Sequence, residues 1–334
     1  MLLIGETLIH SPFLLAPIAG FTDSVVRQIA LEEGAGLVVT ELISANGLLQ
    51  KSKKTFDMLP EADERSPQAV QLFGGEADIL ADAAKLVEDN NRAAIIDLNF
   101  GCPVKKVIKN RAGAAILKSP TNAFKIVEAV ASNVSLPVTV KIRTGWNSES
   151  DNLKDIAKAI EDGGAKAITI HGRTAKQGYS GTANWELIKE TAKYISIPVI
   201  GNGDILSAQD GVQRLKESQL QYVMIGRGAI GNLSIFKDAT CLLNGTYKPD
   251  QTEVDIIEKR WSILQKHINL SAKKYGNQTG GRIMKSHYRY YSKGFKGASK
   301  FRDQIVRVDD LQAQLQIATE YFESLLLQEL NCYR

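Results

Sequence analysis

The sequence is poor in cysteine, and its three cysteines lie far apart. Cys102, Cys241 and Cys332 are an odd number among 334 residues, and no cluster of histidine, cysteine and acidic residues has the spacing of a metal site. These absences argue against a disulfide-stapled scaffold and against a bound metal. They favour a reducing compartment, so we expect the protein in the cytoplasm.

Long apolar runs are also absent. No stretch approaches the ~20 apolar residues of a membrane span, and the first ten residues lack the basic start of a signal peptide. With 44% hydrophobic and 23% charged residues, the composition is that of a globular protein and not of a disordered or collagen-like chain. At roughly 150 residues per domain, the length suggests two domains, or one large barrel with an appendage.

Acidic residues are nearly missing from one late segment. Residues 259–307 contain thirteen lysines and arginines but a single acid, Asp303, so this segment carries a net charge of +12. The rest of the chain carries −8, although the whole sequence is only +4. An acidic body with a strongly basic segment indicates a polyanionic partner.

Short apolar runs recur through the first two thirds of the chain, with helical patterns between most of them. Runs that are apolar without alternation are typical of strands buried on both faces. Eight such runs over about 230 residues predict a (β/α)8 TIM barrel in the α/β class, with a doubly wound open sheet as the alternative. The runs are residues 13–16, 37–40, 69–73, 94–98, 138–142, 167–170, 197–200 and 222–225.

The pattern changes after the eighth run. Residues 247–252 are polar and contain Pro249, and beyond them only helical periodicity is found. We therefore predict a barrel domain in residues 1–245 and a small all-helical domain in residues 250–334. The periodic apolar positions are Leu311, Leu315, Ala318, Phe322 and Leu325.

Polar and glycine-rich segments follow nearly every predicted strand. In TIM barrels the carboxyl ends of the strands converge on one face, so these segments predict an active site there. The candidates, in chain order, are Pro17, Ile18, Ala19, Gln71, Asn99, Cys102, Lys141, Arg143, His171, Arg173, Asn202, Gly203, Asp204, Gly226 and Arg227.

The segments after the last two strands predict a phosphate site. Residues 201–204 (GNGD) and 226–228 (GRG) offer backbone N–H groups, and Arg227 offers a bidentate cation. Barrels often bind phosphate at this place, although the glycines could merely close tight turns. Residues 226–231 also match GxGxxG, but no acid ends a second strand about 20 residues later, so we reject a dinucleotide-binding domain.

Several of these side chains allow more than one interpretation. The thiol of Cys102 could act as an acid or a nucleophile, because a pKa near ~8.5 leaves it mostly protonated at neutral pH. Lys141 could stabilise an anionic ring or an oxyanion, and Gln71 could bind the edge of a heterocycle. Each could instead be structural, and His171 could equally be a core histidine.

Together these residues resemble the tRNA-dihydrouridine synthase family, and within it the bacterial DusB-like group. The resemblance runs along almost the whole chain, and the combination of motifs is highly specific. The motifs are APIAGFTD (16–23), VQLFGG (70–75), DLNFGCPVKKV (97–107), VKIRTGW (140–146), TIHGRT (169–174), IPVIGNGDI (197–205) and MIGRGAIGN (224–232).

The resemblance implies a flavin-binding barrel that reduces the C5=C6 bond of uridine in tRNA, with FMN as cofactor and NADPH as reductant. Hydride from the reduced flavin would go to C6, and Cys102 would give a proton to C5. Asn99, Arg143 and Arg173 would bind the substrate. The residues implied in FMN binding are Pro17, Ile18, Ala19, Gln71, Lys141, His171, Asn202, Gly203, Asp204, Gly226 and Arg227.

The basic segment fits a tRNA partner. Lys285, Arg289 and Lys293 are expected to contact its phosphates, and the interleaved aromatics could stack on bases or belong to a helical core. A flavin oxidoreductase acting on a free small molecule, similar to dihydroorotate dehydrogenase, is the alternative and needs no basic segment. A non-catalytic RNA-binding barrel should have lost Cys102 or Lys141, and both are present.

Overall fold

The computed structural model describes residues 2–61, 67–250 and 252–332. The chain divides into two compact units, Met1–Arg227 and Gly228–Arg334. In this division the helix α10 (Ile235–Leu243) groups with the later helices, whereas the sequence-based domains separate at residues 245–250.

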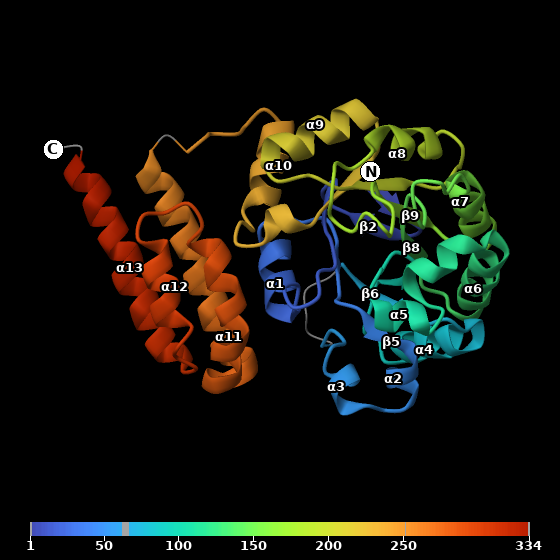
Figure 1. Ribbon diagram of the computed structural model, residues 1–334, viewed down its shortest axis with the longest axis horizontal. Coiled ribbons are helices and arrows are strands. Elements are labelled where there is room, and N and C mark those ends of the chain that lie inside the picture. Colours follow the sequence, from blue (N-terminus) through green and yellow to red (C-terminus); the bar gives the residue numbers. More distant parts are fainter. Residues whose placement is uncertain (1, 62–66, 251, 333–334) are drawn as a thin grey trace. The chain divides into compact units, whose positions relative to one another are not determined.

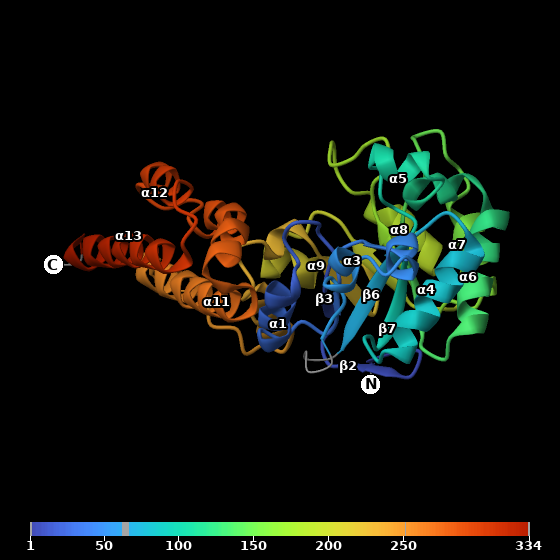
Figure 2. The same cartoon turned by 90° about the horizontal axis from the view of Figure 1, so that it is seen from below.

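The first unit is built on a parallel barrel (Figures 1 and 2). In the described part of the chain, eight strands pair in the order β4-β3-β11-β10-β9-β8-β7-β6, and the pairing of β4 with β6 closes the ring. Closure confirms the predicted TIM barrel and excludes the open sheet. The strands are β3 (Phe13–Leu15), β4 (Val38–Val39), β6 (Gln68–Phe73), β7 (Ile95–Asn99), β8 (Val138–Arg143), β9 (Ala167–His171), β10 (Val199–Asn202) and β11 (Tyr222–Ile225).

Helices surround the barrel, and α4, α6, α7, α8 and α9 follow one another around its outside (Figure 1). Both faces of each strand are therefore covered, which explains why the strands are apolar without alternation. A short strand, β5 (Ile43–Ser44), also pairs with β6. The helical segments of this unit are α1 (Ser24–Glu32), α2 (Ala45–Leu49), α3 (Lys53–Phe56), α4 (Ala77–Asp89), α5 (Lys105–Lys109), η1 (Gly113–Lys118), α6 (Pro120–Asn133), α7 (Leu153–Asp162), α8 (Trp185–Ala192) and α9 (Ala208–Ser218).

A hairpin that the sequence analysis did not predict closes one end of the barrel. Its strands β1 (Leu2–Ile4) and β2 (Thr7–Ile9) are antiparallel. Their residues Ile4 and Ile9 pack into the barrel core with Tyr222, whose hydroxyl donates to the carbonyl of Leu3 at 3.0 Å. The hairpin seals the end of the barrel that holds the amino ends of the strands, so the opposite end is left for the site.

The second unit is helical in its described residues, as predicted. After η2 (Arg227–Ala229) it contains α10, α11 (Glu253–Tyr291), α12 (Ala298–Ile305) and α13 (Leu311–Cys332). Gly276 interrupts α11 with a φ of 71°, which glycine adopts at little cost. Aromatic side chains form the core of this unit, where the ring of Trp261 stacks on that of Phe322 at a centroid distance of 4.9 Å.

A buried histidine should make this unit sensitive to acid. The Nδ1 atom of His267 lies 3.2 Å from the hydroxyl of Tyr291, and its Nε2 atom has no hydrogen-bond partner among the described residues. Burial, aided by His287, holds the pKa of His267 well below 6.5, so the folded ring is neutral. The unfolded ring takes up a proton below about pH 6.5, so stability contributed by the neutral ring is lost as the pH falls.

We expect hydrogen exchange in α11 to accelerate as the pH falls from 7 to 5, beyond its intrinsic pH dependence. In His267→Phe, opening of the helix should take up about one proton fewer. The opening free energy should then change by ~1.4 kcal/mol less per pH unit. Exchange mass spectrometry of peptides from α11, with barrel peptides as the internal control, measures it. An unchanged pH dependence in His267→Phe would show that this ring is not responsible.

Candidate active site

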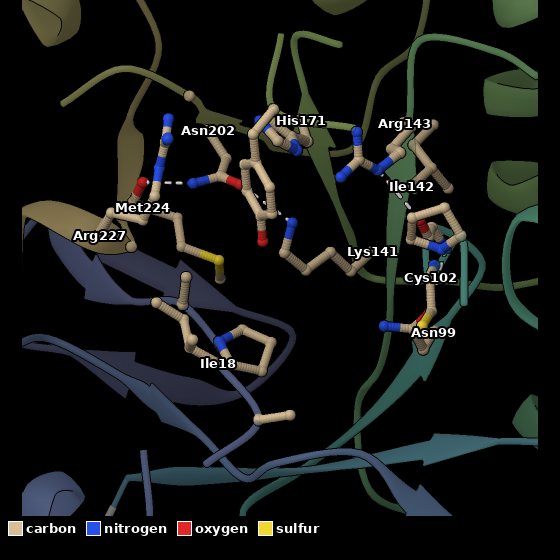
Figure 3. Close-up of a pocket in the computed structure, with 18 of the residues that line it drawn as sticks. Ile18, Asn99, Cys102, Lys141, Ile142, Arg143, His171, Asn202, Met224 and Arg227 are labelled. Atoms are coloured by element: carbon tan, nitrogen blue, oxygen red, sulfur yellow. Dashed lines mark hydrogen bonds between the residues drawn. The ribbon is translucent and has the colours of Figure 1, made fainter. Parts of the chain in front are cut away.

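A cavity of about 330 Å³ opens at the carboxyl ends of the barrel strands (Figure 3). Its lining includes fourteen of the fifteen barrel residues that the sequence analysis proposed for the site. They are Pro17, Ile18, Ala19, Gln71, Asn99, Cys102, Lys141, Arg143, His171, Asn202, Gly203, Asp204, Gly226 and Arg227.

Strand register explains why these residues meet. Lys141 on β8 is the direct neighbour of Asn99 on β7, and His171 on β9 is the neighbour of both Arg143 and Asn202. Because side chains alternate between the two faces of a strand, neighbours in register point to the same side, here the barrel interior. These side chains therefore form a polar layer inside the barrel at the carboxyl ends of the strands.

Cys102 is held by the amide of Asn99. The Oδ1 atom of Asn99 accepts hydrogen bonds from the backbone N–H groups of Gly101 at 3.2 Å and Cys102 at 2.9 Å, while its Nδ2 atom donates to Gln71 at 2.9 Å. The side chain of Cys102 is only 9% exposed. Burial raises the pKa of its thiol, although Arg143 acts in the opposite direction. The thiol is thus protonated at neutral pH, as an acid must be.

Lys141 and His171 differ in charge. The ammonium of Lys141 donates to Oδ1 of Asn202 at 3.0 Å, and burial together with Arg143 lowers its pKa to about 8. It therefore remains mostly charged at neutral pH. Burial and the surrounding cations, including Lys141 and Arg227, lower the pKa of His171 to about 2, so its ring is neutral. Lys141 can stabilise an anion, whereas His171 can only donate or accept a hydrogen bond.

Arg173 is described but does not belong to the cavity lining. The residue is 2% exposed, and its guanidinium donates to both carboxylate oxygens of Asp204, at 2.8 and 2.9 Å. It also donates to the carbonyls of Ser180 and Gly181. Its observed contacts hold Asp204 and the loop after β9, and the predicted direct contact with substrate has no support in this geometry.

Arg227 lies at the rim of the cavity. One of its nitrogens is 3.2 Å from Oδ1 of Asp204, and its side chain is 44% exposed. Gly203 precedes Asp204 with a φ of 133°, and a Cβ atom there would approach Ala183 to 2.5 Å, so only glycine fits. Arg227 and the backbone of Gly203 thus line the same cavity, and their contact with a phosphate stays a prediction.

Tyr179, which was not among the residues predicted for the site, also lines the cavity. Its ring is 61% exposed, and the guanidinium carbon atoms of Arg227 and Arg143 lie 4.8 and 5.9 Å from its centroid. The residue belongs to the loop between β9 and α8. An aromatic residue in a loop at the catalytic end of the barrel is the signal that could have found it.

The structure of the helical unit shows which cations of the predicted basic surface are exposed and which are paired with acids. Lys285 donates to Asp309, which also lies 3.6 Å from Arg282, so this lysine is already paired. Arg289 and Lys293 are exposed. The aromatic residues of the segment mostly favour the core interpretation over base stacking, because Tyr288, Tyr291, Phe295 and Phe301 are buried.

Neither a metal cluster nor a membrane span is found in the described chain. Within residues 2–61, 67–250 and 252–332, no three histidine, cysteine or acidic side chains are grouped so that they could hold a metal ion. No helix in the same part of the chain is both long and apolar enough to span a membrane.

Comparison with known proteins identifies the family. The model of the Dihydrouridine synthase (Dus) family matches residues 14–326. The chain is 38% identical to tRNA-dihydrouridine synthase B of Vibrio vulnificus over 96% of its own length and 99% of that protein. It is 36% identical to a probable tRNA-dihydrouridine synthase of Rickettsia bellii over 98% and 100%. The chain belongs to the dihydrouridine synthase family and is an oxidoreductase of that family.

Solved structures support the fold. Histamine dehydrogenase from Rhizobium sp. 4-9 superposes with a TM-score of 0.54 at 14% identity over 79% of this chain, and 2-naphthoyl-CoA reductase with 0.53 at 11% over 73%. The chain spans about half the length of each, 50% and 51%. At such identities the likeness shows the fold alone.

Proposed function

We propose that this protein reduces the C5=C6 bond of uridine in tRNA to 5,6-dihydrouridine, with FMN as cofactor and NADPH as reductant. The observation that carries the proposal is the presence of a protonated thiol, Cys102, and a half-buried cation, Lys141, in the lining of one cavity of a chain of this family. The names of the relatives, which are tRNA-dihydrouridine synthases over nearly the whole length of this chain, support a tRNA substrate. A tRNA substrate also agrees with the cytoplasmic location that we expect for the protein.

The donor set of the cavity fits FMN. Arg227 and the backbone around Gly203 and Gly226 would hold the phosphate, and Lys141 would face the ring edge that becomes anionic on reduction. Gln71 and Asn202 offer amide groups to the heterocycle. When bound, the cofactor would supply hydride to C6 of the uracil. No metal is needed for this chemistry.

The residues of this chain then have distinct tasks. Hydride addition at C6 leaves enolate-like charge on C5 and the C4 oxygen, and the S–H proton of Cys102 passes to C5. The thiolate formed is electrostatically stabilised by Arg143, whose charge lowers the thiol pKa. Asn99 would hold the base, and Arg143, which donates to the carbonyl of Gly101 at 3.1 Å, would keep the Cys102 loop in place. The target base must leave its stack to enter the cavity.

Removing the guanidinium of Arg227 should weaken flavin binding. Loss of a charge-assisted bidentate contact costs about 1.5–3 kcal/mol, or roughly ten- to hundredfold in affinity. Arg227→Ala should therefore purify with less FMN, and Arg227→Lys should fall between it and the wild type. Fluorescence titration of cofactor-free protein with FMN measures this, and Arg214→Ala, a change on α9 outside the cavity lining, is the control. Wild-type FMN affinity in Arg227→Ala would show that Arg227 does not bind the phosphate.

Assay of the purified protein tests the function directly. Incubation with NADPH and unmodified tRNA transcripts should produce dihydrouridine, detected as a mass gain of two hydrogens per modified uridine. The alternative, reduction of a free pyrimidine or enone, would give turnover with uracil, uridine or orotate-like compounds and none with tRNA. Absence of dihydrouridine in tRNA, with FMN bound and reduced, would contradict the proposal.

A further inference from the structure

A row of polar side chains crosses the barrel interior beneath the cavity. Gln71 on β6 is in register with Asp97 on β7, and Asp97 is in register with Thr139 on β8. All three are at most 4% exposed. Asn99, two residues beyond Asp97 on the same face of β7, joins this row to the cavity. Asp97 and Thr139 are not part of the cavity lining, so they have no contact with a ligand to explain them.

The hydrogen bonds of the row all run toward Asp97, because Asn99 donates to Gln71 and Gln71 donates to Asp97. Asp97 accepts from the Nε2 atom of Gln71 and from the hydroxyl of Thr139, both at 2.6 Å. Because Nε2 of Gln71 faces Asp97, its Oε1 faces Asn99 and accepts from Nδ2 at 2.9 Å. Asn99 must then turn its Oδ1 to the N–H groups of Gly101 and Cys102. Each amide orientation follows from the one before it.

We propose that Asp97 is a positioning residue that sets the orientation of the Gln71 and Asn99 amides and, through them, the loop that carries Cys102. Both carboxyl oxygens of Asp97 accept here, one from Gln71 and one from Thr139, whereas an amide can present either end. In this bonding pattern Asp97 offers Gln71 an acceptor only. Burial raises the pKa of Asp97, and the hydrogen bonds from Gln71 and Thr139, with the charge of Lys141, act against that rise.

The orientation has a consequence for the substrate, which rests on the proposed function. Both acceptor sites of Asn99 Oδ1 are used by backbone N–H groups, and one Nδ2 hydrogen is left for the cavity. Asn99 therefore offers a ligand a donor and no acceptor. It can meet a uracil carbonyl, whereas the amino group of cytosine would face it donor to donor.

Exchanging the two side chains tests the proposal. In Asn99→Asp, the carboxylate introduced at position 99 faces Oε1 of Gln71, acceptor to acceptor, because Asp97 prevents Gln71 from turning. In the double variant Asp97→Asn, Asn99→Asp, both bonds that the Gln71 amide makes to positions 97 and 99 can form in reverse. The amide introduced at position 97 donates to Gln71, and Gln71 donates to the carboxylate at position 99, which can still accept from the Cys102 loop. One buried carboxylate is present in the wild type and in the double variant.

The readouts are melting temperature and alkylation of Cys102 by iodoacetamide, in cofactor-free protein at pH 8.5. Peptide mass spectrometry separates Cys102 from the other cysteines. Asn99→Asp should melt at least about 3 °C lower and alkylate roughly tenfold faster, because an unpaired buried acceptor is costly and the loop is released. Adding Asp97→Asn should restore both values. Asp97→Asn alone lets Gln71 turn either way, so its Cys102 should alkylate at a rate between those of the wild type and Asn99→Asp.

Thr139→Val is the matched control, because it removes one hydrogen bond to Asp97 without changing the direction of the row. It should leave the alkylation rate unchanged. A double variant that is as unstable as, or less stable than, Asn99→Asp would overturn the proposal, and so would an Asn99→Asp protein with wild-type values. Neither readout involves FMN or tRNA, so failure here is distinct from failure of the proposed reaction.

Discussion

Replacing Cys102 by alanine is expected to slow dihydrouridine formation by about 10²–10⁴-fold, the usual contribution of a general acid. The reason is that C5 of the reduced base needs a proton, and in the proposed reaction the buried thiol of Cys102, in the cavity lining, would supply it. Flavin content and the rate of flavin reduction by NADPH should stay at wild-type values, because neither step uses the thiol. Single-turnover mixing of reduced enzyme with tRNA separates the two half-reactions.

Cys241→Ala is the matched control, since Cys241 is a free cysteine in the helical unit. It should behave as wild type in both half-reactions. Full tRNA activity in Cys102→Ala would show that Cys102 is not the general acid. Equal loss in both half-reactions would instead show that the substitution damages flavin binding.

The second large effect is expected at the basic surface of the helical unit. A triple change of Arg289, Lys293 and Lys296 to alanine should weaken tRNA binding steeply at low salt, because these side chains are exposed and can meet phosphates. Each phosphate contact contributes ~0.7–0.9 to the slope of log affinity against log salt, so three contacts should flatten it by about two to nearly three units. Lys285, already paired with Asp309, should contribute less.

The control removes the same charge from the outside of the barrel. Lys125 on α6, Lys154 on α7 and Lys216 on α9 are also exposed, and their replacement by alanine should leave the slope close to wild type. Flavin content should be unchanged in both triple variants. Parallel salt plots for the wild type and the first triple variant would mean that these cations do not contact RNA, as the small-molecule alternative requires.

The barrel could be predicted from the sequence because its strands are buried on both faces. Apolar runs such as residues 138–142 have no other common explanation when helices lie between them, and all eight appear as strands. The hairpin of β1 and β2 was missed because its strands have three residues each and Glu6 interrupts them. Two-residue β5 is shorter still.

The site residues were predictable where their position on a strand alone decides whether their side chains meet. Asn99, Lys141 and His171 meet because strand ends converge, whatever the loops do. The partner of a side chain was not predictable: Arg173 looks like any other strand-end cation, yet Asp204 binds it through both carboxylate oxygens. Asp97 was hidden within an apolar run, where one acid gives no indication of what it will meet.

The hairpin that seals the barrel has a consequence for the order of folding. Its Leu3 carbonyl binds the hydroxyl of Tyr222, 219 residues later in the chain. Ile4 and Ile9 share their core cluster with early residues such as Leu14 and with Tyr222 of the eighth strand, and contacts this distant in sequence form slowly. The hairpin can therefore seal this end of the barrel completely only after the last strand has joined the sheet, which makes sealing a late step of folding.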